Sequence, residues 1–175
     1  MTYQEKVEWI FEQHRSTNHL YDNYIPYEFH LKMVAQVAKD YQHLITQNDR
    51  TVAILAAYGH DLLEDTRISY NDVKKVLGEQ VADIIYAVTN EKGKSRKERA
   101  NYKYYEGIRN TPYATFVKLC DRIANVKYSK MFGSSQFDMY KKENESFIMA
   151  LNWKPETEAA VCFTNLFKEL NELFR

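Results

Sequence analysis

Long apolar runs, an excess of one charge and a signal region are all missing from this sequence. No stretch approaches the roughly 20 apolar residues that span a bilayer, and the first residues are polar. Lys and Arg total 24, as do Asp and Glu, so no net charge attracts nucleic acid or an anionic membrane. We therefore expect a cytoplasmic protein that binds neither nucleic acid nor membrane and that captures any anion locally.

Cysteine, glycine and proline are also scarce. Cys120 and Cys162 lie in apolar helical patterns without metal-type spacing, so we expect both to be buried and reduced. The five glycines and three prolines lie mostly where a helix should begin or end. A chain of 175 residues can bury one full core but not two. These features predict a single all-α domain over residues 1–175, a bundle of about eight to ten helices.

Apolar residues spaced by three and four predict the first helices. Thr2 with Glu5 forms a capping-box pattern for a helix that runs to residues 12–15. Pro26 suits the first position of a second helix. Asn48 can cap a third helix, which is apolar almost all round and is therefore expected at the centre of the fold.

The second half of the chain continues the helical pattern. Capping and apolar spacing predict a short helix from Ser69 to Gly78, a helix with a buried face over 81–88, and a basic surface loop over 90–99. Thr111 and Pro112 should open the next helix. Two more should follow, after the 133–135 loop and after Pro155, and the last should span Glu156 to Phe174. The apolar side chains of this last helix either pack on the core or make a homodimer possible; they are Phe167, Leu170, Leu173 and Phe174.

Four ionisable side chains directly follow the apolar third helix. His60, Asp61, Glu64 and Asp65 have separations of three and four that put side chains on one helical face. Clustered carboxylates beside a buried helix repel one another unless a cation or a proton offsets them, and a metal ion is the simplest solution. The mixed nitrogen and oxygen donors suit Mn²⁺, Fe²⁺, Zn²⁺ or Co²⁺, and affinity order alone does not choose among them.

Two further residues of ligand type are embedded in apolar patterns on other predicted helices. His30 lies in the second helix, and Asp121 interrupts the apolar residues of the helix over 116–123. Taken alone, His30 is more simply a hydrogen-bonded core histidine. Asp121 is as readily a salt-bridge partner of Lys118 or Arg122.

Together with their surroundings, these residues resemble the HD superfamily of metal phosphohydrolases, and within it the RelA/SpoT-type alarmone hydrolase branch with its small stand-alone members. The resemblance covers most of the chain. It rests on Tyr27-Glu-Phe-His-Leu-Lys-Met-Val-Ala35, Ala56-Ala-Tyr-Gly-His-Asp-Leu-Leu-Glu-Asp-Thr66, Leu77-Gly-Glu-Gln-Val-Ala82, Val88-Thr89 and Val117-Lys-Leu-Cys-Asp-Arg-Ile-Ala-Asn125.

The resemblance implies a single all-helical HD phosphohydrolase domain with Mn²⁺ bound by His30, His60, Asp61 and Asp121. It also implies a stand-alone hydrolase that removes the 3′-pyrophosphate of guanosine tetra- or pentaphosphate. The catalytic pair would be Glu64 and Asp65, which would orient or deprotonate the attacking water. The alternative for this pair is a solvated acidic helix end.

The substrate contacts implied by the resemblance lie in three places. Asn125 matches the ribose contact of the family, and Lys118 lies on the same helical stripe, where a cation can meet phosphate. The basic loop looks like the family segment that reaches the phosphates, and Arg96 is its best candidate, with Lys142 on a later helix. The alternative is that these cations simply form a solvated face.

The segment before His30 departs from the family pattern. The family usually carries Arg and Lys there, whereas residues 13–24 of this chain lack the basic pair, and Arg15 stands in for only part of it. His19 or Tyr21 could stack on a base, but Asp22 would repel a phosphate.

This altered segment leaves other functions open. They are a hydrolase of another nucleotide, such as an adenine alarmone or NADPH, and a catalytically silent nucleotide-binding sensor. Glu64 and Asp65 speak against the silent sensor, because a pure binder needs no water-activating pair. His14, His19 and His43 are expected at the surface rather than as metal ligands.

Overall fold

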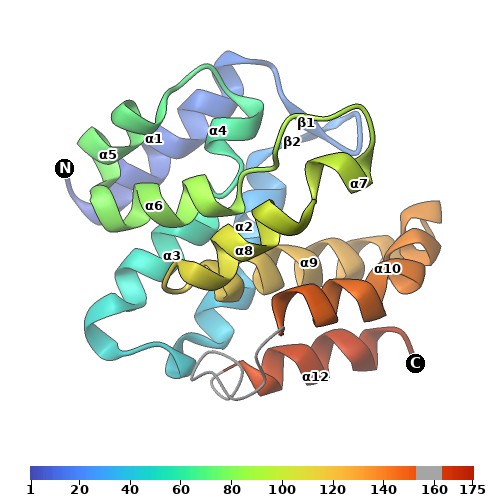
Figure 1. Cartoon of the computed structure of the whole chain (residues 1–175). Helices are drawn as coiled ribbons and strands as arrows, with labels where there is room; N and C mark the ends of the chain where they lie inside the picture. The colour runs from blue at the N-terminus through green and yellow to red at the C-terminus, as the bar shows by residue number, and fades with distance from the viewer. Residues whose placement is uncertain (153–162) are drawn as a thin grey trace.

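The structure is a computed structural model, and it describes residues 1–152 and 163–175. Helices dominate, as expected for an all-α fold, and nine of those in the described residues are longer than one turn (Figure 1). The longer helices are α1 (Tyr3–Ser16), α2 (Glu28–Asp40), α3 (Arg50–Gly59), α5 (Tyr70–Leu77), α6 (Glu79–Val88), α8 (Tyr102–Asn110), α9 (Ala114–Met131), α10 (Ser135–Leu151) and α12 (Thr164–Leu173).

Short elements connect these helices. Two single-turn α-helices are α4 (Leu62–Asp65) and α7 (Arg96–Arg99), and two 3₁₀ turns span Gln42–Leu44 and Gln47–Asp49. The strands β1 (Leu20–Tyr21) and β2 (Ile25–Pro26) form an antiparallel hairpin with Leu20 opposite Pro26. This hairpin, which is the only β-structure in the described residues, was not predicted from the sequence.

The core forms around α3 and α9, which pack against each other and against α2 and α6. Every residue of α3 from Ala53 to Gly59 is buried, which confirms the prediction of a central apolar helix. Gly59 lies where α3 meets α6, because a Cβ there would come within 2.8 Å of the Ile85 Cδ1 atom. This packing fixes the end of α3, and therefore the position of the residue that follows it.

Several predicted helix ends are confirmed. The capping boxes of Thr2 with Glu5 and of Ser69 with Asp72 are both present. Gly78 ends α5 with a φ of 101°, a conformation that residues with a side chain rarely adopt. The hydroxyl of Ser134 caps α10 after the predicted loop.

Three predicted starts are wrong by a few residues. Pro26 pairs in β2 instead of opening α2, because the hairpin keeps the chain extended up to that point. Asn48 lies inside a 3₁₀ turn, and α3 begins two residues later. Thr111 and Pro112 also precede their helix, since the left-handed conformation of Tyr113 separates them from α9.

The end of the chain packs on the core. Phe167 and Leu170 are buried in α12, and Leu173 and Phe174 contact the core cluster. Of the two alternatives for these side chains, the structure therefore favours packing over pairing with a second subunit. Pro155, Cys162 and the first part of the predicted helix from Glu156 lie outside the described residues.

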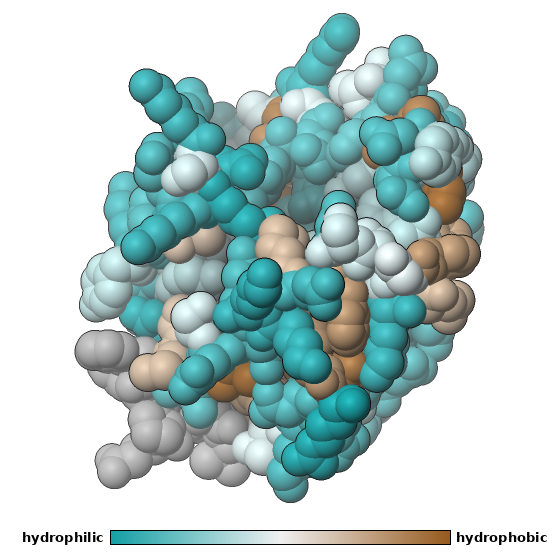
Figure 2. All heavy atoms as spheres, turned by 90° about the vertical axis from the view of Figure 1, so that its right-hand side faces the viewer, coloured by the Kyte–Doolittle hydropathy of each residue, from teal (hydrophilic) through white to brown (hydrophobic). Residues whose placement is uncertain are grey.

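The surface is largely polar. On the face shown in Figure 2, hydrophilic side chains predominate, and apolar ones form patches among them. No helix among the described residues is long and apolar enough to cross a membrane. Cys120 is buried and unpaired, as expected.

Candidate active site

Four side chains from three helical regions meet at the centre of the fold. His30 projects from the first turn of α2, and Asp121 from the middle of α9. His60 and Asp61 occupy the turn between α3 and α4. The helix is interrupted there, but Asp61, Glu64 and Asp65 still line one common cavity. The break lets His60 and Asp61 point to the same place although they are adjacent in the chain.

The donor atoms of these side chains lie close together. The Nε2 atoms of His30 and His60 are 3.2 Å apart, and each lies within 3.6 Å of Oδ1 of Asp121. Oδ2 of Asp61 is 2.8 Å from Nε2 of His60 and 3.7 Å from that of His30. In the part of the chain that the structure describes, His30, His60 and Asp121 form the one group with metal-ligand spacing, and all three are buried.

The chemistry of this donor set fits a divalent cation. Nδ1 of His60 lies 2.9 Å from the carbonyl of Ala57, so this nitrogen donates there and Nε2 faces His30. Burial lowers the pKa of His60, but the carboxylates of Asp61 and Asp121 outweigh it and raise that pKa well above its usual value. The cluster therefore stabilises positive charge between its nitrogens and oxygens, as a metal site must.

Further hydrogen bonds hold the two carboxylates in place. The Tyr27 hydroxyl donates to Oδ2 of Asp61 at 2.5 Å. The Asn125 amide donates to Oδ1 of Asp121 at 2.6 Å, and Lys118 Nζ lies 3.0 Å from the other oxygen. Although burial raises the pKa of Asp121, Lys118 and the two histidines lower it well below its usual value. Both carboxylates are thus held ionised and oriented toward the histidines.

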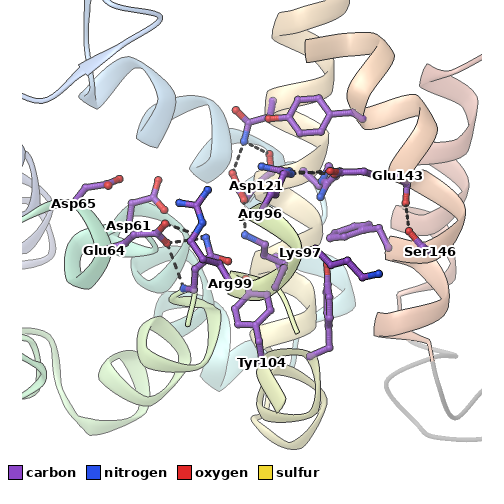
Figure 3. Close-up of a pocket in the computed structure, with 18 of the residues that line it drawn as sticks. Asp61, Glu64, Asp65, Arg96, Lys97, Arg99, Tyr104, Asp121, Glu143 and Ser146 are labelled. Atoms are coloured by element: carbon purple, nitrogen blue, oxygen red, sulfur yellow. Dashed lines mark hydrogen bonds and ion pairs between the residues drawn. The ribbon is translucent and has the colours of Figure 1, made fainter. Parts of the chain in front are cut away.

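A cavity of about 630 Å³ opens beside this cluster (Figure 3). The structure brings most of the predicted site residues to its wall, which includes His30, Asp61, Glu64, Asp65, Arg96, Lys118, Asp121 and Asn125. Cations from two regions face it: the α7 region supplies Arg96, Lys97 and Arg99, and α9 supplies Lys118 and Arg122. Cationic side chains are therefore gathered at one site in a chain with no net charge, and five carboxylates share the same wall: Asp61, Glu64, Asp65, Asp121 and Glu143.

The two predicted catalytic carboxylates differ in their surroundings. Both oxygens of Glu64 accept from the side-chain amide of Asn90, at 2.9 and 3.0 Å, and this fixes their direction. Asp65 lies beside His19, whose Nδ1 is 3.7 Å from Oδ2. Burial, together with the charges of Asp61 and Glu64, raises the pKa of Asp65 to about 7. Asp65 can therefore exchange a proton near neutral pH.

Two predicted substrate contacts do not reach the cavity. Arg15 lies outside it, because its guanidinium is held by Glu8 at 2.6 Å, Glu12 at 2.9 Å and Glu28 at 2.8 Å. Lys142 is exposed on α10 and does not line the cavity, whereas its neighbour Glu143 does.

His19 and Tyr21, the two candidates for stacking on a base, are also absent from the cavity wall, whereas Tyr27 lines it. His19 stacks on Tyr27 with 3.8 Å between ring centroids, and Tyr21 stacks on His30. Neither lines the cavity as a platform for a base. His14 is buried rather than exposed, with 1% of its surface accessible, so that expectation is wrong.

Sequence reasoning missed a cluster on the far side of the cavity. Arg122 was considered only as a salt-bridge partner of Asp121, but its guanidinium lies 3.1 Å from Glu143 and over the ring of Phe147. Arg96 lies 2.8 Å from the same carboxylate (Figure 3). The sequence offered one signal for this cluster: Glu143 directly follows Lys142 on the same predicted helix.

Known proteins resemble this chain in both sequence and structure. The family described as HD domain matches residues 27–126. The chain is similar to guanosine-3′,5′-bis(diphosphate) 3′-pyrophosphohydrolase MESH1 of Danio rerio, with 30% identity over 70% of this chain and 66% of that protein. For MESH1 of Drosophila melanogaster, the identity is 31% over 42% of this chain and 41% of that protein. The matched segments thus span between about two fifths and two thirds of these relatives.

A solved structure is similar over a longer range. It is described as "A metazoan ortholog of SpoT hydrolyzes ppGpp and plays a role in starvation responses". The TM-score is 0.73, with 25% identity over 99% of this chain and 93% of that one. The likeness therefore includes the helices on both sides of the cavity.

Proposed function

This chain belongs to the HD domain family, and from that premise we propose that it is a metal-dependent phosphohydrolase. Its proposed reaction is removal of the 3′-pyrophosphate of guanosine tetra- or pentaphosphate, or of a closely related nucleotide. One observation carries the proposal: the buried His30, His60 and Asp121, with the half-buried Asp61, lie beside a cavity with five cationic side chains. A site for a divalent ion next to cations matches the needs of a phosphate ester. The activity named for the MESH1 relatives supports the same reaction.

The four clustered residues would hold the divalent ion, which we propose to be Mn²⁺, as their imidazole and carboxylate donors permit. When bound, such an ion draws charge from phosphoryl oxygens and lowers the pKa of water. The backbone carbonyl of Ala57 sets the proton of His60 on Nδ1, which leaves Nε2 free to coordinate.

Glu64 and Asp65 would handle the attacking water. Glu64 is held by Asn90 at the cavity wall, which suits a group that orients water. Asp65, with its pKa raised to about 7, suits a group that accepts the proton from water near neutral pH. This pair also supports catalysis over the alternative of a catalytically silent nucleotide-binding sensor.

The cations of the α7 region and Lys118 would bind the phosphates of the substrate. Arg96, Lys97 and Arg99 come from one short segment and all line the cavity. Lys118 lines the cavity and lies 3.0 Å from Asp121, so it can neutralise a phosphoryl group beside the ligand cluster.

A second candidate is a phosphohydrolase of another phosphorylated nucleotide, such as an adenine alarmone or NADPH. It is favoured by the position of Arg15, whose charge is offset by three carboxylates outside the cavity. As a result, the segment from residue 13 to residue 26 supplies no cation to the cavity wall. We also propose that residues 1–175 form one domain, because buried residues from α1 to α12 belong to a single core cluster.

The test is an assay of the chelator-treated protein with Mn²⁺ restored. Guanosine tetraphosphate, its adenine counterpart and NADPH are the substrates, and released pyrophosphate and phosphate are measured separately. We expect manganese-dependent pyrophosphate release from the guanine alarmone, and its loss in Asp61→Ala because a metal ligand is removed. Asp138→Ala, at an exposed position on α10, is the matched control and should keep full activity.

Each outcome of this assay selects one function. Phosphate release from NADPH, or pyrophosphate release from the adenine alarmone alone, would move the specificity to the second candidate. Metal binding without turnover of any of the three substrates would instead favour the sensor.

A further inference from the structure

The segment between α1 and α2 lies against the ligand cluster, although it contributes no cation to the cavity. This segment, residues 19–27, contains the β1–β2 hairpin and is here called the tyrosine hairpin. Asp22 and Asn23 adopt positive φ values of 50° and 69° at its turn. The Tyr128 hydroxyl on α9 donates to Asp22 Oδ2 at 2.8 Å, so the turn is tied to the helix that carries Asp121.

Tyr27, at the end of the tyrosine hairpin, contacts the first ligand carboxylate. Its hydroxyl donates to Oδ2 of Asp61, the same oxygen that lies 2.8 Å from Nε2 of His60. The ring of Tyr27 is fixed by stacking on His19 at 3.8 Å and on His14 at 4.9 Å. Asp61 is therefore oriented by a phenol that is itself immobilised by two rings.

Tyr21 reaches the second ligand carboxylate through Asn125. The Tyr21 hydroxyl donates to Oδ1 of Asn125 at 2.9 Å, and the Asn125 amide donates to Oδ1 of Asp121 at 2.6 Å. Both ends of the amide group are thus engaged. This fixes which end of Asn125 faces Asp121.

Tyr21 also orients a ligand histidine. Its ring lies parallel to that of His30, with centroids 4.8 Å apart and planes 6° apart. Nδ1 of His30 is buried and has no hydrogen-bond partner among the described residues, whereas Nδ1 of His60 has the Ala57 carbonyl. Ligand histidines are usually held by a bond from their second nitrogen. For His30, the stacked Tyr21 ring holds the plane of the imidazole instead, while Nδ1 has no partner among the described residues.

We propose that Tyr21 and Tyr27 are positioning residues that set the affinity of the site for its divalent ion. Tyr27 orients Asp61 directly, while Tyr21 orients Asp121 through Asn125 and His30 through stacking. Asn125 accordingly acts as a relay to the ligand cluster, and it also lines the cavity, where the resemblance to the family implies a ribose contact. The inference rests on the metal site of the proposed function, and it assigns a role to the segment that departs from the family pattern.

The test measures Mn²⁺ binding to the chelator-treated full chain by titration calorimetry, without any substrate. Tyr27→Phe and Tyr21→Phe each remove one hydroxyl and keep the ring. We expect each to raise the Kd for Mn²⁺ about tenfold or more, as loss of an outer-shell partner does. Tyr24→Phe is the matched control in the same hairpin, since the Tyr24 side chain is 77% exposed, and it should leave the Kd unchanged.

A double-mutant cycle separates the two contributions of Tyr21. In an Asn125→Ala background, Tyr21→Phe should have little further effect on the Kd, because the hydroxyl acts through the amide. Tyr21→Leu should still weaken binding in that background, because it also removes the ring stacked on His30. Full additivity of Tyr21→Phe and Asn125→Ala would overturn the relay.

Metal affinity and fold stability are read separately. Urea unfolding of the metal-free proteins shows whether a variant is merely less stable. Unchanged Kd values in Tyr21→Phe and Tyr27→Phe overturn the inference, whether or not these variants are less stable. The proposed function still stands in that case if the wild type binds Mn²⁺ and Asp61→Ala does not. Failure of the wild type to bind Mn²⁺ overturns both.

Discussion

His14 shows how a single side chain connects the outer helix α1 to the ligand cluster. Its ring is buried and stacks on Tyr27 and His19. Burial lowers the pKa of His14 to about 4, and the nearby His19, His60 and His30 act in the same direction, against Asp61. The folded protein therefore keeps His14 neutral at a pH at which the unfolded chain binds a proton.

This neutral histidine makes the free energy of unfolding depend on pH. The pKa of His14 in the folded protein lies below its unfolded value of 6.5, so protonation favours the unfolded chain. His14 therefore costs no stability above pH 6.5, and the free energy of unfolding falls as pH drops toward 4. The loss attributable to His14 should be about 3 kcal/mol. Urea unfolding of the metal-free protein at several pH values measures it.

The comparison for this prediction is between two histidine variants. His14→Leu should flatten the decline between pH 6.5 and pH 4, whereas His43→Leu, at an exposed site, should keep it. An equal decline in wild type and His14→Leu would assign the effect to other groups.

At the residue scale, the sequence contained most of the information about the clustered side chains and less about their supports. The clustering of His30, His60, Asp61 and Asp121 could be predicted because their types and order match a known pattern. His14 was predicted at the surface, although Val7, Ile10, Phe11 and His14 follow helical spacing, which indicates a common buried face. That periodicity was the available signal.

At the scale of elements, the helices are separated by specific backbone conformations. Gly78 ends α5 and directly precedes α6, with φ 101° and ψ 161°, a region occupied almost only by glycine. Gly107 lies within α8, where no atom would contact an added Cβ. A methyl group added at Gly78 would therefore strain the backbone, whereas one added at Gly107 would meet no other atom.

Substitution of these two glycines by alanine should act in opposite directions. Gly78→Ala should lower the free energy of unfolding by about 1–3 kcal/mol through backbone strain. Gly107→Ala should raise it by about 0.5–1 kcal/mol, because alanine is the better helix former. Urea denaturation of both variants measures the difference, and equal effects would contradict the backbone argument.

Helix ends set by a capping side chain or by a glycine could be predicted, whereas those set by neighbouring structure could not. Ser69, Gly78 and Ser134 have local roles that their residue types reveal. Pro26 was predicted to open α2, but it pairs with Leu20 in the hairpin instead. Asp22 and Asn23 tolerate positive φ and were the local signal for that hairpin.

At the scale of the whole molecule, one carboxylate connects three elements across the cavity. Glu143 on α10 binds Arg96 of α7 and Arg122 of α9. Burial raises the pKa of Glu143, but the two arginines outweigh it and hold that pKa below its usual value, so the group stays ionised. Glu143 thus occupies two guanidinium groups that, under the proposed function, would otherwise be open to a substrate phosphate.

Glu143→Gln should therefore lower KM for the nucleotide substrate, with little change in kcat or in Mn²⁺ affinity. Because the competing ion pair is partly exposed, its loss should change KM by about two- to fivefold. Steady-state kinetics measure this, and Glu145→Gln, an exposed position on α10, is the control. A rise in KM would mean that Glu143 holds Arg96 and Arg122 in their binding positions instead of competing for them.

Pairs that are distant in the chain explain what sequence spacing could not reveal. Tyr21 and Asn125 are 104 residues apart, and Arg96 and Glu143 are 47 apart. Such contacts depend on how the helices pack, and no local pattern encodes them. Periodicity predicted the helical class, but the supports of the site required the assembled fold.

The buried thiol of Cys120 has a practical consequence, because it directly precedes Asp121 in α9 and is fully inaccessible. Its burial also raises the pKa of the thiol well above the usual value. In a Cys162→Ser background, a thiol reagent can modify Cys120 only when α9 opens. Mn²⁺ at 100 times its Kd should slow that labelling about 100-fold. Modification rates with and without the ion would thus report metal occupancy in the absence of any substrate.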